Sequence, residues 1–168
     1  ELQICMYHIP PLAGIGFTPE LAARLSQSFP EIFVAYKDSS GDFENTKAVI
    51  AAAPEVAVFP GSELFLKEGL EHGGMGCISA TCNVNPEAIR HIYDVGIGDQ
   101  SDDLEAINDK MVSFRRTVEK YGPIPAMKGM LALKRGDSRW RNVRPPILPS
   151  SASATGELIQ ELGSELNL

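Results

Sequence analysis

Lys37 is the residue of this sequence best suited to covalent chemistry. It ends the apolar run 32–36 and is followed at once by the turn-forming residues 38–42. A continuous apolar run of this length is typical of a parallel strand, and α/β folds usually place chemistry at the carboxyl ends of such strands. An amine held among apolar neighbours pays a desolvation penalty when charged, so it can become the neutral nucleophile that condenses with a carbonyl. The alternative is a lysine that extends its ammonium group to solvent.

Tyr7 occupies the same kind of place at the end of another apolar segment, for which we predict a strand over residues 2–7. If the two strands are successive and parallel, Tyr7 and Lys37 open onto the same face. A phenol beside an imine-forming amine is a suitable proton relay, because it can both donate to and accept from the carbinolamine oxygen. Buried tyrosines at strand ends are also common for packing reasons. The pair therefore suggests imine chemistry without deciding it.

Composition narrows the class of protein. The chain has 168 residues, 43% of them hydrophobic, and a formal net charge of −7. The acidic balance argues against nucleic acid or an anionic membrane as a partner, and no apolar run approaches the roughly 18 residues of a membrane-spanning helix. The cysteines form an odd count with no paired framework, which fits a reducing compartment. We therefore expect a cytoplasmic protein with three free thiols: Cys5, Cys77 and Cys82.

A strand followed by a helix recurs along the first hundred residues. This alternation predicts a parallel sheet with right-handed crossovers. The predicted strands cover residues 2–7, 32–37, 56–59 and 75–79, and their helices are capped by Thr18, Asp42, Ser62 and Asn85.

The remainder of the chain is expected to be helical. We predict helices over residues 101–121 and 125–135, and a last helix opened by Thr155 or Gly156. Residues 1–100 are thus predicted to form one α/β domain, and residues 101–168 an appended helical layer.

Metal and cofactor sites are not predicted. The three histidines form no i, i+4 pair, and Cys77 and Cys82 have the wrong spacing for a zinc knuckle. Gly14 and Gly16 follow a strand and precede a helix, as in dinucleotide-binding proteins, but the third glycine is missing and a partial motif is weak evidence. Carbon–carbon chemistry here would therefore need an organic electron sink, which a lysine imine supplies.

The end of the third predicted strand offers a second candidate site. Gly61 allows a close approach, while Ser62 and Glu63 place a hydroxyl and a carboxylate at a helix N-terminus, where amides can bind an anionic or polyhydroxy substrate. The plainer interpretation is that Ser62 is an N-cap and that Glu63 complements the helix dipole.

Four segments of the chain together resemble the dihydrodipicolinate synthase / N-acetylneuraminate lyase family. Their order and spacing fit along essentially the whole chain, including the helical residues 124–128. The segments are Tyr7-His8-Ile9-Pro10 with Gly14, then residues 36–42, 60–63 and 73–83.

The resemblance implies a (β/α)₈ barrel that forms a Schiff base between a lysine on strand six and pyruvate or another 2-oxo acid. Lys37 would be that lysine, and Tyr7 the proton-relaying tyrosine at the end of strand five. Gly61, Ser62 and Glu63 would contact the distal part of the substrate, and Ile78 would be the strand-eight residue whose backbone faces the lysine. An aldehyde as the second substrate, no cofactor, and a homo-oligomer, often a tetramer, are implied as well.

Two positions depart from the family pattern. Leu12 stands where the synthase pattern has an arginine that binds a dicarboxylate, so the resemblance favours the lyase-type branch. His8 stands where the family usually has asparagine.

The length also departs from the family. A (β/α)₈ barrel takes about 250 residues, and the four predicted strands resemble strands five to eight. The strand-two segment Gly-Thr-Thr/Ser-Gly-Glu, which holds the 2-oxo acid carboxylate in the family, is absent from this sequence. We therefore expect the carboxyl-terminal half of a Schiff-base aldolase or lyase. The alternative is a catalytically incompetent half-barrel with a structural or interaction role.

Overall fold

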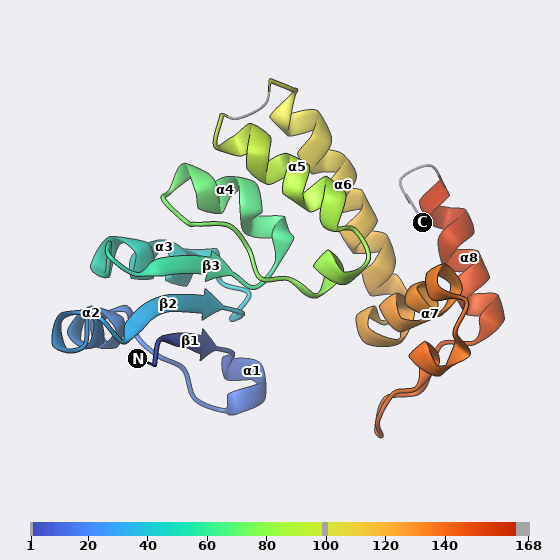
Figure 1. Ribbon diagram of the computed structural model, residues 1–168, viewed down its shortest axis with the longest axis horizontal. Helices are drawn as coiled ribbons and strands as arrows, with labels where there is room; N and C mark the ends of the chain where they lie inside the picture. Colours follow the sequence, from blue (N-terminus) through green and yellow to red (C-terminus); the bar gives the residue numbers. More distant parts are fainter. Residues whose placement is uncertain (1, 99–100, 164–168) are drawn as a thin grey trace. The chain divides into compact units, whose positions relative to one another are not determined.

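The sheet that carries Tyr7 and Lys37 is parallel. The computed structural model describes residues 2–98 and 101–163, and within them three strands pair in the order β1-β2-β3 (Figure 1). The register sets Tyr7 opposite Lys37 on the neighbouring strand, and Lys37 opposite Phe59 on the third. The alternation of parallel strands and helices predicted from the sequence is therefore present. The strands are β1 (Ile4–His8), β2 (Phe33–Asp38) and β3 (Ala57–Pro60).

The described residues divide into two compact units. Among the described residues, one unit comprises residues 2–80, 91–98 and 101–102, and the other residues 81–90 and 103–163. The sequence predicts a barrel domain up to residue 100 and a helical layer after it. The two compact units do not test that division, which stays a prediction. The helices, including the short 3₁₀ helices η1 to η3, are α1 (Pro10–Ala13), α2 (Pro19–Ser28), α3 (Phe43–Ala52), η1 (Glu63–Phe65), α4 (Leu66–Glu71), η2 (Ala80–Asn83), α5 (Pro86–Gly96), α6 (Leu104–Lys120), α7 (Pro123–Arg135), η3 (Ser138–Arg141) and α8 (Ala152–Leu162).

Helices α2 and α3 cover one face of the sheet. Their starts are fixed as predicted, because the Thr18 side chain accepts from the Leu21 N–H and the Asp42 side chain accepts from the Glu44 N–H. Apolar side chains of both helices pack on those of β2 and β3 and remove them from water, which stabilises this unit. The buried cluster is Ala22, Phe33, Tyr36, Val49, Ala53, Val56 and Val58.

The fourth predicted strand, residues 75–79, is not a strand. The segment does follow β3, since the Met75 N–H donates to the Val58 carbonyl at 2.9 Å and the Ile78 N–H donates to the Pro60 carbonyl at 3.0 Å. Positions 75 and 78 are three residues apart, whereas positions 58 and 60 are two apart, so the segment carries one extra residue. Gly76 takes a φ of +135° within it. The extra residue interrupts the ladder in the manner of a β-bulge.

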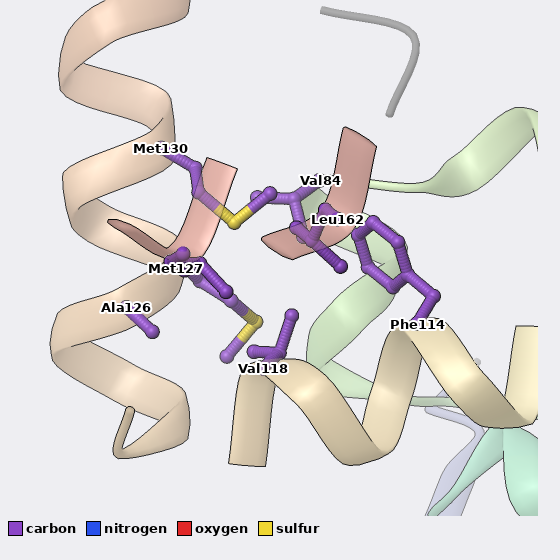
Figure 2. Close-up of a cluster of buried hydrophobic side chains, with 8 residues drawn as sticks. Val84, Phe114, Val118, Ala126, Met127, Met130 and Leu162 are labelled. Carbon is purple, nitrogen blue, oxygen red and sulfur yellow. The ribbon is translucent and has the colours of Figure 1, made fainter. Parts of the chain in front are cut away.

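The second unit has its own apolar core. Figure 2 shows Met127 and Met130 extending from α7 toward Val118 of α6 and toward Val84. Methionine fills irregular gaps well because its side chain is unbranched. The buried members are Val84, Phe114, Val118, Ala126, Met127, Met130, Leu158 and Leu162.

Three predicted helix starts in the carboxyl-terminal part were wrong by two to four residues. The long helix begins at Leu104 rather than Ser101, because the Asp103 side chain caps it by accepting from the Ala106 N–H. The helix predicted from residue 125 begins at Pro123, a residue whose fixed φ suits the first helical position. The last helix begins at Ala152 rather than at residue 155 or 156, because Ser151 accepts from the Ala154 N–H at 3.0 Å.

In the part of the chain that the structure describes, no helix is long and apolar enough to cross a membrane.

Candidate active site

Tyr7 and Lys37 lie side by side near the carboxyl ends of β1 and β2. They are directly opposite in the parallel register, and the Lys37 Nζ lies 4.0 Å from the centroid of the Tyr7 ring. Tyr36 and Asp38, which flank Lys37, are buried on the helix-covered side. Because side chains alternate along a strand, Lys37 lies on the other face of the sheet. Tyr7 is 47% exposed there, so the pair is open to a small molecule.

The Ser39 side chain interacts with the Tyr7 phenol of this pair. The pKa of the Tyr7 phenol is lowered, first by a hydrogen bond with the Ser39 side chain and further by the charge of Lys37, with burial acting in the opposite direction. The Ser39 N–H donates to the carbonyl of His8 at 2.8 Å, which places Ser39 against the end of β1. A phenol flanked by a hydroxyl and an ammonium is stabilised as the phenolate, the form that accepts a proton.

Gly61 provides the space for Ser39. Its N–H donates to the Asp38 carbonyl at 2.6 Å, and a Cβ at this position would lie 1.9 Å from the Ser39 Oγ. Any side chain at position 61 would therefore displace the Ser39 hydroxyl. The close-approach glycine inferred from the sequence is present, and the group that approaches it is Ser39.

Ser62 and Glu63 have local partners. The Ser62 side chain caps η1 by accepting from the Leu64 N–H at 3.3 Å, as the plainer interpretation of the sequence had it. Glu63 has 0% exposed surface and accepts a hydrogen bond from the Ser79 hydroxyl. Its carboxylate therefore offers no exposed atom to a ligand, although Ser79 is partly exposed.

Ile78 lies in the segment that follows β3. Its side chain is 42% exposed and its N–H donates to the Pro60 carbonyl. Among the predicted site residues, the structure thus joins Tyr7 with Lys37, whereas the described contacts of Ser62 and Ile78 are with backbone atoms of their own surroundings.

Ser39 is not among the site residues predicted from the sequence. It stands two positions after Lys37, and residues i and i+2 share a face when a strand continues. The spacing of two residues between Lys37 and Ser39 is therefore the feature of the sequence that could have indicated Ser39. Its contact with Tyr7 depends on the pairing of β1 with β2, which no local pattern shows.

The site residues do not form a metal centre. In the ranges 2–98 and 101–163, no group of three or more His, Cys, Asp or Glu side chains could hold a metal ion. What the geometry offers is a primary amine, a phenol and a hydroxyl within one contact network. Such a set can add to a carbonyl and move protons during the addition.

Parallel strands with helical crossovers define an α/β fold of the kind used by (β/α)₈ enzymes. The amine–phenol pair lies at the strand ends, where such enzymes place their chemistry. Comparison with known proteins agrees. The family model described as the dihydrodipicolinate synthetase family matches residues 1–164, and the chain belongs to this family.

Individual relatives match as well. The chain is 30% identical over 151 residues to an uncharacterized DapA-like lyase of Chloroflexus aurantiacus, covering 90% of this chain and 50% of that protein. It is 28% identical over 131 residues to a 4-hydroxy-tetrahydrodipicolinate synthase of Nitratiruptor, covering 77% of this chain and 44% of that protein.

A solved structure also matches. The dihydrodipicolinate synthase of Agrobacterium tumefaciens superimposes with a TM-score of 0.80 at 26% identity, covering 99% of this chain and 55% of that one. The chain therefore spans about half the length of the relatives it matches, which is consistent with part of a (β/α)₈ barrel.

Proposed function

We propose that this chain is the lysine- and tyrosine-bearing half of an aldolase or lyase that forms a Schiff base with pyruvate or another 2-oxo acid, with an aldehyde as the second substrate or product. The observation that supports this most strongly is the position of the Lys37 Nζ, 4.0 Å from the centre of the Tyr7 ring on the adjacent strand. Family membership supports the same class of reaction.

In this proposal the Lys37 nitrogen attacks the ketone carbon of the 2-oxo acid. The carbonyl oxygen takes a proton from Tyr7 and becomes the carbinolamine hydroxyl, and the Tyr7 phenolate takes a proton from the Lys37 nitrogen. Tyr7 then donates this proton to the hydroxyl, which leaves as water. The protonated imine then accepts the electron pair of the carbon–carbon bond that breaks. In the direction of bond formation it first loses a proton from the adjacent carbon to become the enamine, and that carbon forms the new bond to the aldehyde. Ser39 and Lys37 stabilise the Tyr7 phenolate between the first and second proton transfers.

We extend the proposal to the residues beyond β3. Gly61 and Ser62 would lie near the distal part of the substrate, and the backbone of Ile78 would face Lys37. Glu63 would act through the hydroxyl of Ser79, since Glu63 itself is fully buried. Residues 1–100 as the carboxyl-terminal half of the barrel, residues 101–168 as an appended helical layer, a homo-oligomeric assembly and a cytoplasmic location belong to the same proposal. These four points are supported by family membership alone.

The experiment is an aldol cleavage and condensation assay of the full-length protein against a panel of 2-oxo acids and aldehydes. Lys37→Ala is expected to abolish turnover, whereas Lys47→Ala, which removes a surface ion pair with Glu44, is expected to leave it unchanged. Turnover that survives in Lys37→Ala would contradict the proposal.

The second candidate is a half-barrel without catalysis that has a structural or interaction role. The chain spans only about half the length of its relatives. The intact mass and N-terminal sequence of the purified protein distinguish the two, because a longer parent chain supports the enzyme and a mature protein of these residues alone supports the second candidate.

A further inference from the structure

His8 lies one residue after Tyr7, on the opposite face of β1, and is almost fully buried. It is 6% exposed, and its ring stacks on that of Tyr36 with centroids 5.8 Å apart. Its Nδ1 accepts a hydrogen bond from the Phe17 N–H at 2.9 Å, and its Nε2 lies 4.0 Å from the Asp38 Oδ1. The bond to Phe17 is of ordinary length, whereas 4.0 Å is too long for a hydrogen bond. The principal polar partner of His8 is therefore the backbone of Phe17.

Phe17 ends the segment 9–17, which includes α1 and follows the strand of Tyr7. Its N–H is bound by His8, and its carbonyl accepts from the Tyr36 hydroxyl at 3.3 Å. His8 and Tyr36, which neighbour Tyr7 and Lys37 in the sequence, thus bind both backbone polar groups of Phe17. A Cβ on Gly16 would lie 2.7 Å from the His8 Cε1, so the segment passes directly over the imidazole.

The hydrogen bond from the Phe17 N–H to the His8 Nδ1 requires a neutral imidazole. A ring nitrogen that accepts an N–H carries no proton, so the proton of His8 is on Nε2 and the ring is neutral. A protonated imidazolium has no acceptor, and its Nδ1–H would face the Phe17 N–H. Protonation of His8 therefore removes this tie to the sheet.

The ionisable groups that face His8 come from β2. Asp38 accepts from the Ser40 N–H at 2.9 Å, from the Asn45 Nδ2 at 2.8 Å and from the Thr46 Oγ1 at 2.9 Å, so its carboxylate is already bound at the start of α3. Burial raises the pKa of Tyr36 to about 12, which keeps its hydroxyl neutral. Neither group supplies a replacement acceptor for the Phe17 N–H.

We propose that His8 is a positioning residue whose neutral imidazole holds the segment 9–17, which follows the strand of Tyr7, against the sheet, and whose protonation releases that segment and weakens substrate binding. This inference rests on the proposed aldolase or lyase function, whose substrate the segment would help to bind. The segment carries Leu12, the position at which we expect acceptor selectivity. Tyr7 and Lys37 themselves are held by the β1–β2 ladder, so release should raise KM and leave kcat nearly unchanged.

His8→Asn is the decisive variant. The Asn Oδ1 can take the place of the Nδ1 as acceptor, and asparagine does not titrate between pH 5 and 8. His8→Leu keeps apolar bulk and removes the acceptor at every pH. If His8→Leu does not fold, the comparison of wild type with His8→Asn still decides the question.

The first measurement is hydrogen–deuterium exchange by mass spectrometry on the full-length protein at pH 8 and pH 5, corrected for the intrinsic pH dependence of exchange. Peptides that cover residues 9–17 should lose protection by about tenfold at pH 5 in the wild type, the equivalent of one hydrogen bond. They should lose none in His8→Asn, and peptides from α2 serve as the internal control. Equal loss in wild type and His8→Asn, or no loss in either, would overturn the inference.

The second measurement is the pH dependence of KM. We expect KM to rise about tenfold from pH 8 to pH 5 in the wild type and to stay flat in His8→Asn. A flat KM in the wild type would overturn the inference. The exchange readout needs no turnover, so a failure of the proposed aldolase function leaves it interpretable.

Discussion

The Lys37 Nζ lies 4.0 Å from the centre of the Tyr7 ring, in a parallel register that sets the two residues opposite each other. The next pair in the same register, His8 and Asp38, is buried on the other face. Two adjacent rows of one ladder thus separate the tasks. The Tyr7–Lys37 row lies on the exposed face, and the His8–Asp38 row is hydrogen-bonded to the neighbouring segments.

The phenol is the first group to test. Tyr7→Phe removes the hydroxyl and keeps the ring, so we expect the fold to persist and kcat of the full-length enzyme to fall by about 10²–10⁴, the range for a lost general acid–base. Tyr121→Phe is the matched control, because the Tyr121 hydroxyl binds Glu161 in the other unit. An unchanged rate in Tyr7→Phe would show that Tyr7 is a packing residue.

Ser39 should control the ionisation of Tyr7. Its hydrogen bond, together with the charge of Lys37, lowers the pKa of the Tyr7 phenol. Ser39→Ala removes a donor to the phenolate, so the pKa of Tyr7 should rise and the phenol should ionise at higher pH. NMR of ¹³C-labelled tyrosine, assigned with Tyr7→Phe, measures this directly.

Two variants check that result. Gly61→Ala should act in the same direction as Ser39→Ala, because the new Cβ would displace the Ser39 Oγ. Ser40→Ala should have no effect on Tyr7, since the Ser40 hydroxyl interacts with the backbone of Asp42. A titration curve for Tyr7 that is the same in Ser39→Ala and the wild type would refute the role of Ser39.

Leu12 should limit the choice of acceptor. It is 83% exposed on α1 and offers no cation, whereas a charge-assisted hydrogen bond to a carboxylate contributes about 1.5–3 kcal/mol. We expect the full-length enzyme to prefer a neutral or hydroxylated aldehyde over aspartate semialdehyde. Leu12→Arg should raise the relative kcat/KM for aspartate semialdehyde by roughly tenfold or more, and Leu12→Gln should not. Efficient use of aspartate semialdehyde by the wild type would refute this expectation.

Packing in the second unit can be tested at Gly129. A Cβ there would lie 2.5 Å from the Thr155 Oγ1. Thr155 is fully buried and bound by Arg141 and by the Ser151 carbonyl, so it cannot move aside easily. Gly129→Ala should lower the free energy of unfolding by about 1–3 kcal/mol.

Gly156 provides the matched control for that substitution. A Cβ there would meet no atom within 4 Å, so Gly156→Ala in α8 should be neutral or stabilising by up to ~1 kcal/mol. Urea denaturation of both variants gives the comparison. Equal stability of Gly129→Ala and the wild type would contradict the packing described here.

The sequence predicted those features that depend on local pattern. The apolar run before Lys37 correctly predicted β2, and the caps Thr18 and Asp42 correctly predicted the starts of α2 and α3. Each of these signals depends on residues only a few positions apart in the sequence. The fourth segment was predicted wrongly, since its extra residue shows only in its pairing with β3. The contact of Ser39 with Tyr7 and the space left by Gly61 could not be predicted either, because both depend on how three strands lie side by side.

Reductive trapping tests the central claim most directly. Borohydride reduction of the full-length protein in the presence of pyruvate converts a lysine imine into a stable secondary amine. Peptide mass spectrometry then locates the added mass. We expect it on the peptide that contains Lys37 and expect none in Lys37→Ala. Labelling that persists in Lys37→Ala, or that falls on another lysine of the wild type, would contradict the assignment of Lys37.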